Sequence, residues 1–278
     1  MKPVFSPVLA FLIVLLSGCQ SSNEEGLFIM PQHLAKDLET LASARVFFGH
    51  QSVGNNIIDG LESIARDVQD VDLSIMDFHS FSESAGGCLV HSRVGKNAEP
   101  RSKCVDFGQI IDQKLSGMID YAMLKFCYID INRDTDVAKM FSDYQQIMDD
   151  LVGRHPEITF VHTTIPLRHS PSGPSIWLRE VLGRPNISKL DNIKRNQFNR
   201  LIYSTYGASP IIDIAASEST YPDGTRESFK MDGQTYYSLI GDYTHDGGHL
   251  NAIGSLHVAS TFVQELAQII RGRSSVAE

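Results

Sequence analysis

The residues best suited to chemistry lie near opposite ends of the chain. Close to the C-terminus, Asp246-Gly247-Gly248-His249 places a carboxylate and an imidazole three residues apart on a glycine-rich turn. At this spacing an aspartate can hold an imidazole in one tautomer while the other ring nitrogen faces a nucleophile. Ser52 is the candidate nucleophile, because it lies where an apolar run ends and a helical pattern begins. The three side chains predict acyl-transfer chemistry through an activated serine.

Apolar runs and helical periodicities alternate along the chain that must position these residues. We predict strands at residues 45–49, 71–78, 124–131, 158–163 and 210–214. Helical patterns lie between and after them, around residues 57–65, 110–121, 137–151, 192–206 and 252–270, whereas 79–105 reads as an irregular stretch. This alternation predicts an α/β fold, a three-layer α/β/α domain around a five-stranded parallel sheet.

In such a sheet, ligands bind beyond the carboxyl ends of the strands. Each chemical candidate follows a predicted strand: Ser52 the first, Gly86 and Gly87 the second, Asn132 the third, and Asp246 and His249 the fifth. Attack on an ester carbonyl places negative charge on oxygen, which fixed hydrogen-bond donors must stabilise. The candidate oxyanion-hole donors are the amide of Ser52, an amide at Gly86 or Gly87, and the side chain of Asn132. Long connections at 166–190 and 215–250 are expected to form the substrate rim.

The order of these blocks resembles that of the SGNH/GDSL hydrolases, which are named for Ser, Gly, Asn and His in four separated blocks. Ser52 matches the nucleophile, Gly86 or Gly87 the oxyanion glycine, and Asn132 the oxyanion asparagine. Asp246-Gly247-Gly248-His249-Leu250 matches the closing Asp-x-x-His-Leu block. The resemblance implies a flavodoxin-like domain without metal or cofactor. It also implies a serine esterase that hydrolyses esters of lipids, small acyl groups or acetylated sugars.

Two blocks depart from the family pattern and favour a second hypothesis. Gly49-His50-Gln51-Ser52 stands where the family has Gly-Asp-Ser, and Asp130-Ile131-Asn132-Arg133 stands in place of Gly-x-Asn-Asp. Ser52 also suits a helix cap, a common use of serine. The alternative function is therefore a non-catalytic glycan-binding or envelope-assembly lipoprotein built on the same scaffold.

Other polar side chains near the blocks are open to two interpretations. His50 and Arg133 are candidate substrate contacts, although His50 equally suits a structural hydrogen bond. His245 and His50 together with Asp246 and His249 offer nitrogen and oxygen ligands, but the turn lacks the helical spacing of a zinc protease, so we predict no metal. A basic cluster suits either an anionic substrate or a solvated loop; it comprises His91, Arg93, Lys96, Arg101 and Lys103.

The cysteines are consistent with an exported protein. Cys88 and Cys104 bracket a polar loop and are predicted to form a disulfide, worth about 3 kcal/mol for a loop of roughly 15 residues. Metal ligation is the weaker alternative, since the chain has no C-x-x-C pair. Cys127 lies within an apolar run and is expected to be a buried, inert thiol.

The N-terminus has the pattern of a secretory signal. Lys2 precedes a short apolar run, and Leu16-Ser17-Gly18-Cys19 resembles the lipobox of bacterial lipoproteins. The resemblance implies a signal peptide over 1–18, lipidation of Cys19, a tether over 19–32, one hydrolase-like domain over 33–273 and a tail over 274–278. Gln20 after the cysteine favours an outer-membrane lipoprotein that faces the periplasm or is surface-exposed. The net charge of −9 argues against nucleic acid as a partner.

Overall fold

The computed structural model describes residues 33–68, 71–82 and 86–274. The predicted signal peptide, Cys19 and the tether lie outside these described residues. Within them, six parallel strands form the central sheet in the order β2-β3-β1-β4-β5-β6. The strands are β1 (Arg45–His50), β2 (Ser74–Asp77), β3 (Cys88–Arg93), β4 (Tyr121–Leu124), β5 (Thr159–Thr163) and β6 (Ile211–Ile212).

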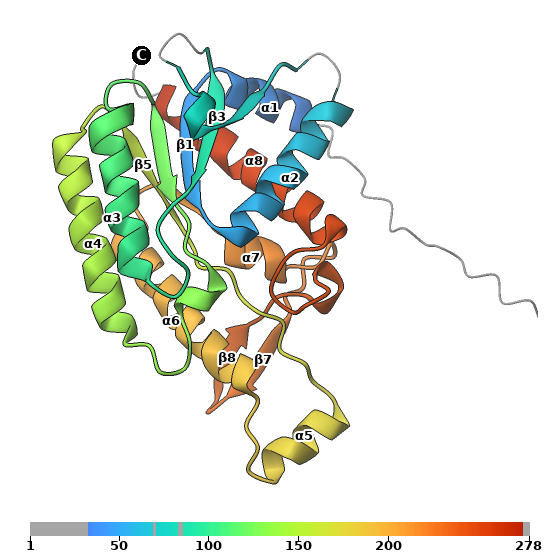
Figure 1. Cartoon of the computed structure of the whole chain (residues 1–278). Helices are drawn as coiled ribbons and strands as arrows, with labels where there is room; N and C mark the ends of the chain where they lie inside the picture. The colour runs from blue at the N-terminus through green and yellow to red at the C-terminus, as the bar shows by residue number, and fades with distance from the viewer. Residues whose placement is uncertain (1–32, 69–70, 83–85, 275–278) are drawn as a thin grey trace, which may run out of the picture.

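Helices cover both faces of this sheet (Figure 1). One face is covered by α1 (Leu34–Ala42), α2 (Ser52–Asp67), α7 (Ile214–Ser219) and α8 (Ala252–Ser274), and the other by α3 (Pro100–Ile110), α4 (Val137–Arg154) and α6 (Ile187–Tyr206). Side chains of adjacent strand residues point to opposite faces. Phe48 accordingly lies in the core beneath α2 and α8, whereas Phe47 lies in the core beneath α3 and α4. The predicted three-layer α/β/α fold is confirmed.

The predicted count of five strands was wrong, because β3 lies inside the stretch expected to be irregular. Its sequence, Cys-Leu-Val-His-Ser-Arg, mixes apolar and polar residues over only six positions and resembles a loop. The predicted strand at 124–131 is also displaced, since β4 ends at Leu124 and a 3-10 turn follows at Tyr128–Asp130. The carboxylate of Asp130 fixes that turn by accepting a hydrogen bond from the amide of Cys127 at 2.7 Å.

The predicted disulfide is not formed: Cys88 and Cys104 are both free, buried thiols. Cys88 begins β3, and six strand residues carry the chain about 17 Å along the sheet. Cys104 lies only one turn, about 6 Å, into the returning helix α3. The two residues therefore lie near opposite edges of the sheet, beyond the roughly 7 Å between Cα atoms that a disulfide can bridge.

The long connections contain further structure. The 166–190 segment carries the short helix α5 (Pro174–Val181), and the 215–250 segment carries an antiparallel hairpin of β7 (Ser228–Met231) and β8 (Gln234–Tyr237). The helix predicted at 110–121 instead continues α3 through a π turn at Ile111–Leu115. None of the described helices is long and apolar enough to cross a membrane.

Candidate active site

Ser52 lies at the point where the strand order reverses. From β1, the chain first builds β3 and β2 on one side and then β4 to β6 on the other. A crevice forms at such a switch point, outside the carboxyl ends of the strands. The loops that follow β1, β3 and β4 therefore meet at one edge of the sheet. Ser52, as the first residue of α2, directly follows β1 and therefore lies at this edge.

The turn before Ser52 is fixed by its neighbour. Gln51 is extended, and its side-chain amide donates hydrogen bonds to the carbonyls of Val94 and Gly95, both at 2.9 Å, which ties the β1 loop to the β3 loop. The Oγ atom of Ser52 lies 3.6 Å from Sγ of Cys127 in the β4 loop. The Ser52 amide lies in the first helical turn, where amides lack intrahelical acceptors and the dipole favours negative charge.

Asp246 and His249 form a directly bonded pair. Nδ1 of His249 donates to Oδ2 of Asp246 at 2.6 Å, and the amides of Gly248 and His249 donate to Oδ1, each at 2.8 Å. The side-chain hydrogen bond from His249, followed by these amides, holds the pKa of Asp246 well below its usual range. Gly247 has φ of +79°, a left-handed conformation that favours glycine. The pairing leaves Nε2 of His249 as the nitrogen that can accept a proton.

Two links bring the distant segments together. Asn56, one turn along α2 from Ser52, accepts a hydrogen bond from the amide of Leu250 at 3.2 Å. On the other side, Cys127 contacts Ser52, while the hydroxyl of the next residue, Tyr128, lies 3.5 Å from Nδ1 of His249. Within the described residues, no hydrogen bond joins Ser52 directly to His249. These contacts connect the start of α2 with the Asp246–His249 turn, without a direct hydrogen bond between the serine and the imidazole in the described structure.

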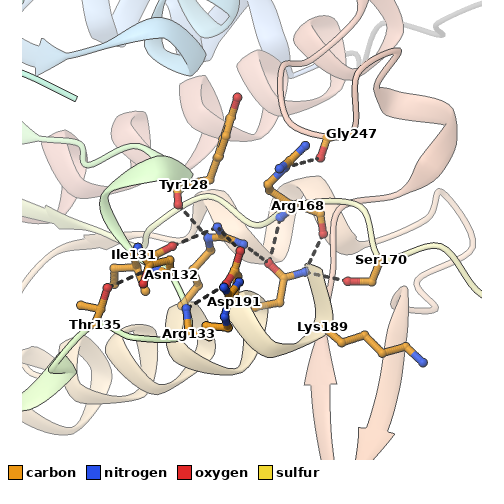
Figure 2. Close-up of polar contacts among 12 residues, drawn as sticks. Tyr128, Ile131, Asn132, Arg133, Thr135, Arg168, Ser170, Lys189, Asp191 and Gly247 are labelled. Atoms are coloured by element: carbon orange, nitrogen blue, oxygen red, sulfur yellow. Dashed lines mark hydrogen bonds and ion pairs between the residues drawn. The ribbon is translucent and has the colours of Figure 1, made fainter. Parts of the chain in front are cut away.

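Tyr128 and Arg168 support the closing loop and were not singled out from the sequence, because neither belongs to a recognisable spacing. Arg168 donates from Nε to the carbonyl of Gly247 at 3.2 Å (Figure 2). It also donates from Nη2 to the carbonyl of Asp246 at 3.3 Å. Its guanidinium lies 5.4 Å from the centre of the Tyr128 ring. Gly248 packs so closely on that ring that a Cβ atom there would overlap it. The Tyr128 ring therefore packs against the turn that carries His249 and limits where that turn can lie.

Gly86 and Gly87 lie at the amino ends of the strands, whereas Ser52 lies at the carboxyl ends, so neither glycine can serve as an oxyanion donor. Both immediately precede β3, and the amide of Cys88 donates to the carbonyl of Ala44 at the start of β1, at 2.9 Å. Gly87 is packed against the backbone of Ala42. Because β1 and β3 are parallel, this is the amino edge, opposite Ser52. The error arose because β3 was not recognised.

The loop at the carboxyl end of β3, on the same side as Ser52, contains Gly95. This residue has φ of +56°, and its amide is used by Asp106, to which it donates at 2.8 Å. Asp130 connects the loop to the β4 loop by pairing with Lys103 at 2.5 Å and accepting from the amide of Ala98 at 2.9 Å. Lys103 is fully buried in this pair, so the predicted basic cluster is not one exposed surface.

Asn132 and Arg133 lie in an exposed turn (Figure 2). The side-chain oxygen of Asn132 accepts from the amide of Asp134 at 2.8 Å, and its own amide donates to Oγ1 of Thr135 at 3.0 Å. The Arg133 amide donates to Asp191 on α6 at 2.8 Å. These local contacts give no support to an oxyanion role for Asn132 or to substrate binding by Arg133.

His50 is buried, which favours the structural alternative over a substrate contact. Its ring is fully buried under Gly54, with Nδ1 3.1 Å from the carbonyl of Gln51 and Nε2 3.2 Å from Nδ1 of His91. Burial lowers the pKa of His50 to about 3, so the ring is neutral.

Across the part of the chain that the structure describes, no three His, Cys, Asp or Glu side chains gather closely enough to hold a metal ion.

Comparison with known proteins gives matches in structure alone. No family model and no curated protein sequence matches the chain. A lipase/acylhydrolase from Enterococcus faecalis is 13% identical, with 81% of this chain and 96% of that one covered and a TM-score of 0.47. An acetyl xylan esterase is 16% identical (79% and 98% covered, TM-score 0.46). A member of the lipolytic G-D-S-L family from Veillonella parvula is 10% identical (79% and 95% covered, TM-score 0.44).

Proposed function

We propose that the chain is a serine esterase or acylhydrolase of the SGNH/GDSL type. The observation that carries this proposal is the convergence of Ser52, at the start of α2, with the bonded Asp246–His249 pair, through the Asn56–Leu250 hydrogen bond. A serine hydroxyl, an imidazole oriented by a carboxylate and a helix N-terminus are the parts that acyl transfer needs.

In the proposed mechanism, Nε2 of His249 removes the hydroxyl proton as Oγ of Ser52 attacks the ester carbonyl. Asp246 holds the ring and stabilises the imidazolium that forms. The carbonyl oxygen becomes an oxyanion, which the Ser52 amide stabilises. Collapse of the intermediate expels the alcohol, which takes the proton from His249. Water then hydrolyses the acyl-serine by the same sequence. Substrate binding must draw Ser52 from Cys127 toward His249, as catalytic hydrogen bonds often tighten only in the complex.

The substrate class and location are proposed from the sequence. An acetylated envelope or dietary polysaccharide is the first candidate and a lipid ester the second. The lipobox-like segment ending at Cys19 supports anchoring in the outer membrane, facing the periplasm or the cell surface.

The test is hydrolysis of p-nitrophenyl acetate and butyrate. We expect Ser52→Ala and His249→Ala each to lower kcat by about 10³-fold or more. Ser172→Ala and His245→Ala, which alter exposed residues outside the proposed triad, are the matched controls and should retain activity. A fluorophosphonate probe should label Ser52 in the unaltered protein. Full hydrolysis by both the Ser52 and His249 variants would exclude the mechanism.

A second candidate is glycan binding without catalysis. It is favoured by one observation: Ser52 contacts the sulfur of Cys127, and no hydrogen bond joins it to His249 in the described structure. Under this alternative, the probe fails to label Ser52 and all esters remain intact. The protein would still bind an acetylated polysaccharide, with equal affinity in the Ser52→Ala variant.

A further inference from the structure

Helix α5 stands clear of the three layers of the domain. Figure 1 shows it projecting from the body beyond the β7–β8 hairpin. All eight of its residues are at least partly exposed, and none belongs to either core cluster. The projection begins at Gly173, with φ of +118°, and turns back at Gly183, with φ of +76°. Both conformations favour glycine, so the excursion is built into the backbone.

The outward face of α5 is apolar. Trp177 is 63% exposed and Leu182 is 69% exposed, and Leu178 and Val181 lie between them around the helix axis. At about 100° per residue, these four side chains span an arc of roughly 140°. On the opposite side, Glu180 accepts a hydrogen bond from Nζ of Lys189 on α6 at 2.9 Å. This ion pair holds the polar side of α5 toward the domain and leaves the apolar face outward.

Basic residues flank this apolar face in a chain that is otherwise acidic. The chain carries a net charge of −9, yet Arg179 and Arg184 are exposed beside the stripe, and neither has a carboxylate partner among the described residues. A helix with Trp and Leu on one side and arginines at its margin is typical of elements that lie at a lipid–water interface. Its charge is complementary to an anionic surface.

A second copy of this chain fits the face poorly. Eight residues make a helix about 12 Å long, which is too small for the roughly 1,200 Å² of a stable dimer interface. Pairing two such faces would also bring the arginines of both copies together. Folding back over Ser52 is opposed by the Glu180–Lys189 pair, which fixes the other side of the helix.

We infer that α5 is a membrane-docking element that inserts Trp177 and its apolar neighbours into the headgroup region of an anionic lipid bilayer. One short helix binds weakly and reversibly. It therefore acts beside a second attachment, for which the predicted lipid on Cys19 is suited. Docking requires no part of the Ser52 triad and goes beyond the proposed esterase activity. Because α5 follows the carboxyl end of β5, docking through α5 would place the carboxyl ends of the strands toward the membrane.

The chain contains a single tryptophan, Trp177, which makes the test specific. Its fluorescence in the full chain is measured with vesicles of phosphatidylcholine alone and of phosphatidylcholine mixed with phosphatidylglycerol. We expect the emission to shift to shorter wavelength with the anionic vesicles, and brominated acyl chains to quench it. Because the signal arises only from α5, attachment through the N-terminus cannot produce it.

Three variants sharpen this test. Leu178→Ser combined with Leu182→Ser should abolish the shift. The control is Val152→Ser on α4, which alters a side chain about as exposed as Leu178 and should leave the shift unchanged. Arg179→Glu with Arg184→Glu should weaken the apparent affinity for anionic vesicles by about tenfold or more. Ser52→Ala should respond like the unaltered protein, which separates docking from the esterase proposal.

Other outcomes would overturn the inference. Vesicles that sediment with the protein while Trp177 keeps the emission of the free protein would show attachment without α5. A shift that needs no vesicles and grows with protein concentration would identify a second copy as the occupant. A shift produced only by an acetylated polysaccharide would identify a glycan surface.

Discussion

At the scale of single residues, the site is organised around the imidazole of His249. Asp246 binds one ring nitrogen, and the low pKa of that carboxyl keeps it ionised at neutral pH. Tyr128 contacts the same ring edge-on, with ring centres 5.6 Å apart. Burial, and then the charge of Asp246, raises the pKa of Tyr128, so its hydroxyl stays protonated and neutral, and its oxygen faces the Nδ1–H that His249 donates to Asp246. Tyr128 therefore belongs with the residues that position His249.

This role predicts a modest kinetic effect for Tyr128→Phe. The change removes one long hydrogen bond, and a neutral hydrogen bond is worth about 0.5–1.5 kcal/mol, so kcat should fall by about three- to tenfold. The ring remains stacked under Arg168, and the melting temperature should hardly change. Steady-state kinetics of the purified variant provide the measurement. Tyr203→Phe, which removes a hydroxyl bonded to Asp213 outside the site, is the control and should keep full activity.

At the scale of elements, the site depends on how closely α2 and α8 approach. Helix α2 begins with Ser52, and α8 follows directly after the loop that carries His249. The packing of these two helices therefore sets the distance between Ser52 and His249. Gly60 lies at their contact, where a Cβ atom would overlap the backbone of Ser255 and the side chain of Ala259. The absence of a side chain at Gly60 thus allows α2 and α8 to pack closely, which the proposed triad requires.

We predict that Gly60→Ala destabilises the fold by about 1–3 kcal/mol, the usual cost of overpacking a core, and lowers ester hydrolysis. Gly153→Ala on α4 is the matched control, because no atom lies within 4 Å of its added methyl group. That control should gain up to about 1 kcal/mol from helix propensity. Urea denaturation measures both. Equal stabilisation of the two variants would contradict the packing argument.

The elements also show what the sequence could and could not reveal. Long amphipathic patterns such as α4 and α8 and the Asp246–His249 turn depend on local spacing, and they were predictable. The strand β3 was missed because six mixed residues between two cysteines resemble a loop, and this single omission misplaced Gly86, Gly87 and the disulfide. Tyr128 and Arg168 contact the His249 turn only through tertiary contacts. Such contacts cannot be predicted from the spacing of residues along the sequence.

At the scale of the whole molecule, several ionisable groups are buried or half-buried, and burial shifts their pKa values toward the uncharged forms. Lys125 is fully buried, its Nζ donates to the carbonyl of Phe126 at 3.1 Å, and burial lowers its pKa. Glu218 is also fully buried and accepts a hydrogen bond from the amide of Leu167. Burial raises the pKa of Glu218 to about 8 and that of Glu265 to about 7, while burial lowers that of His162 to about 4.

These shifts predict that the fold is most stable at mildly acidic pH. A buried histidine with a lowered pKa, such as His50 at about 3, destabilises the fold as pH falls from 6.5, because the unfolded chain gains a proton that the native state refuses. A buried carboxyl with a raised pKa acts oppositely. Glu218 stabilises the fold fully below pH 4.5 and loses that contribution as pH rises toward 8.

The alkaline side of this optimum belongs mainly to Glu218, with a pKa of about 8, since Glu265, with a pKa of about 7, is already half ionised at pH 7. Between pH 7 and 8, the free energy of unfolding should fall by up to about 1.4 kcal/mol per pH unit, the slope of one proton. Glu218→Gln keeps an oxygen acceptor for the Leu167 amide but cannot ionise, so its stability should fall less steeply over this range, by the remainder that Glu265 contributes. Urea denaturation at pH 7.0, 7.5 and 8.0 measures both slopes, with Glu62→Gln as the exposed control. If the Glu218 variant lost stability as steeply as the unaltered protein, another buried group would have to carry the titration.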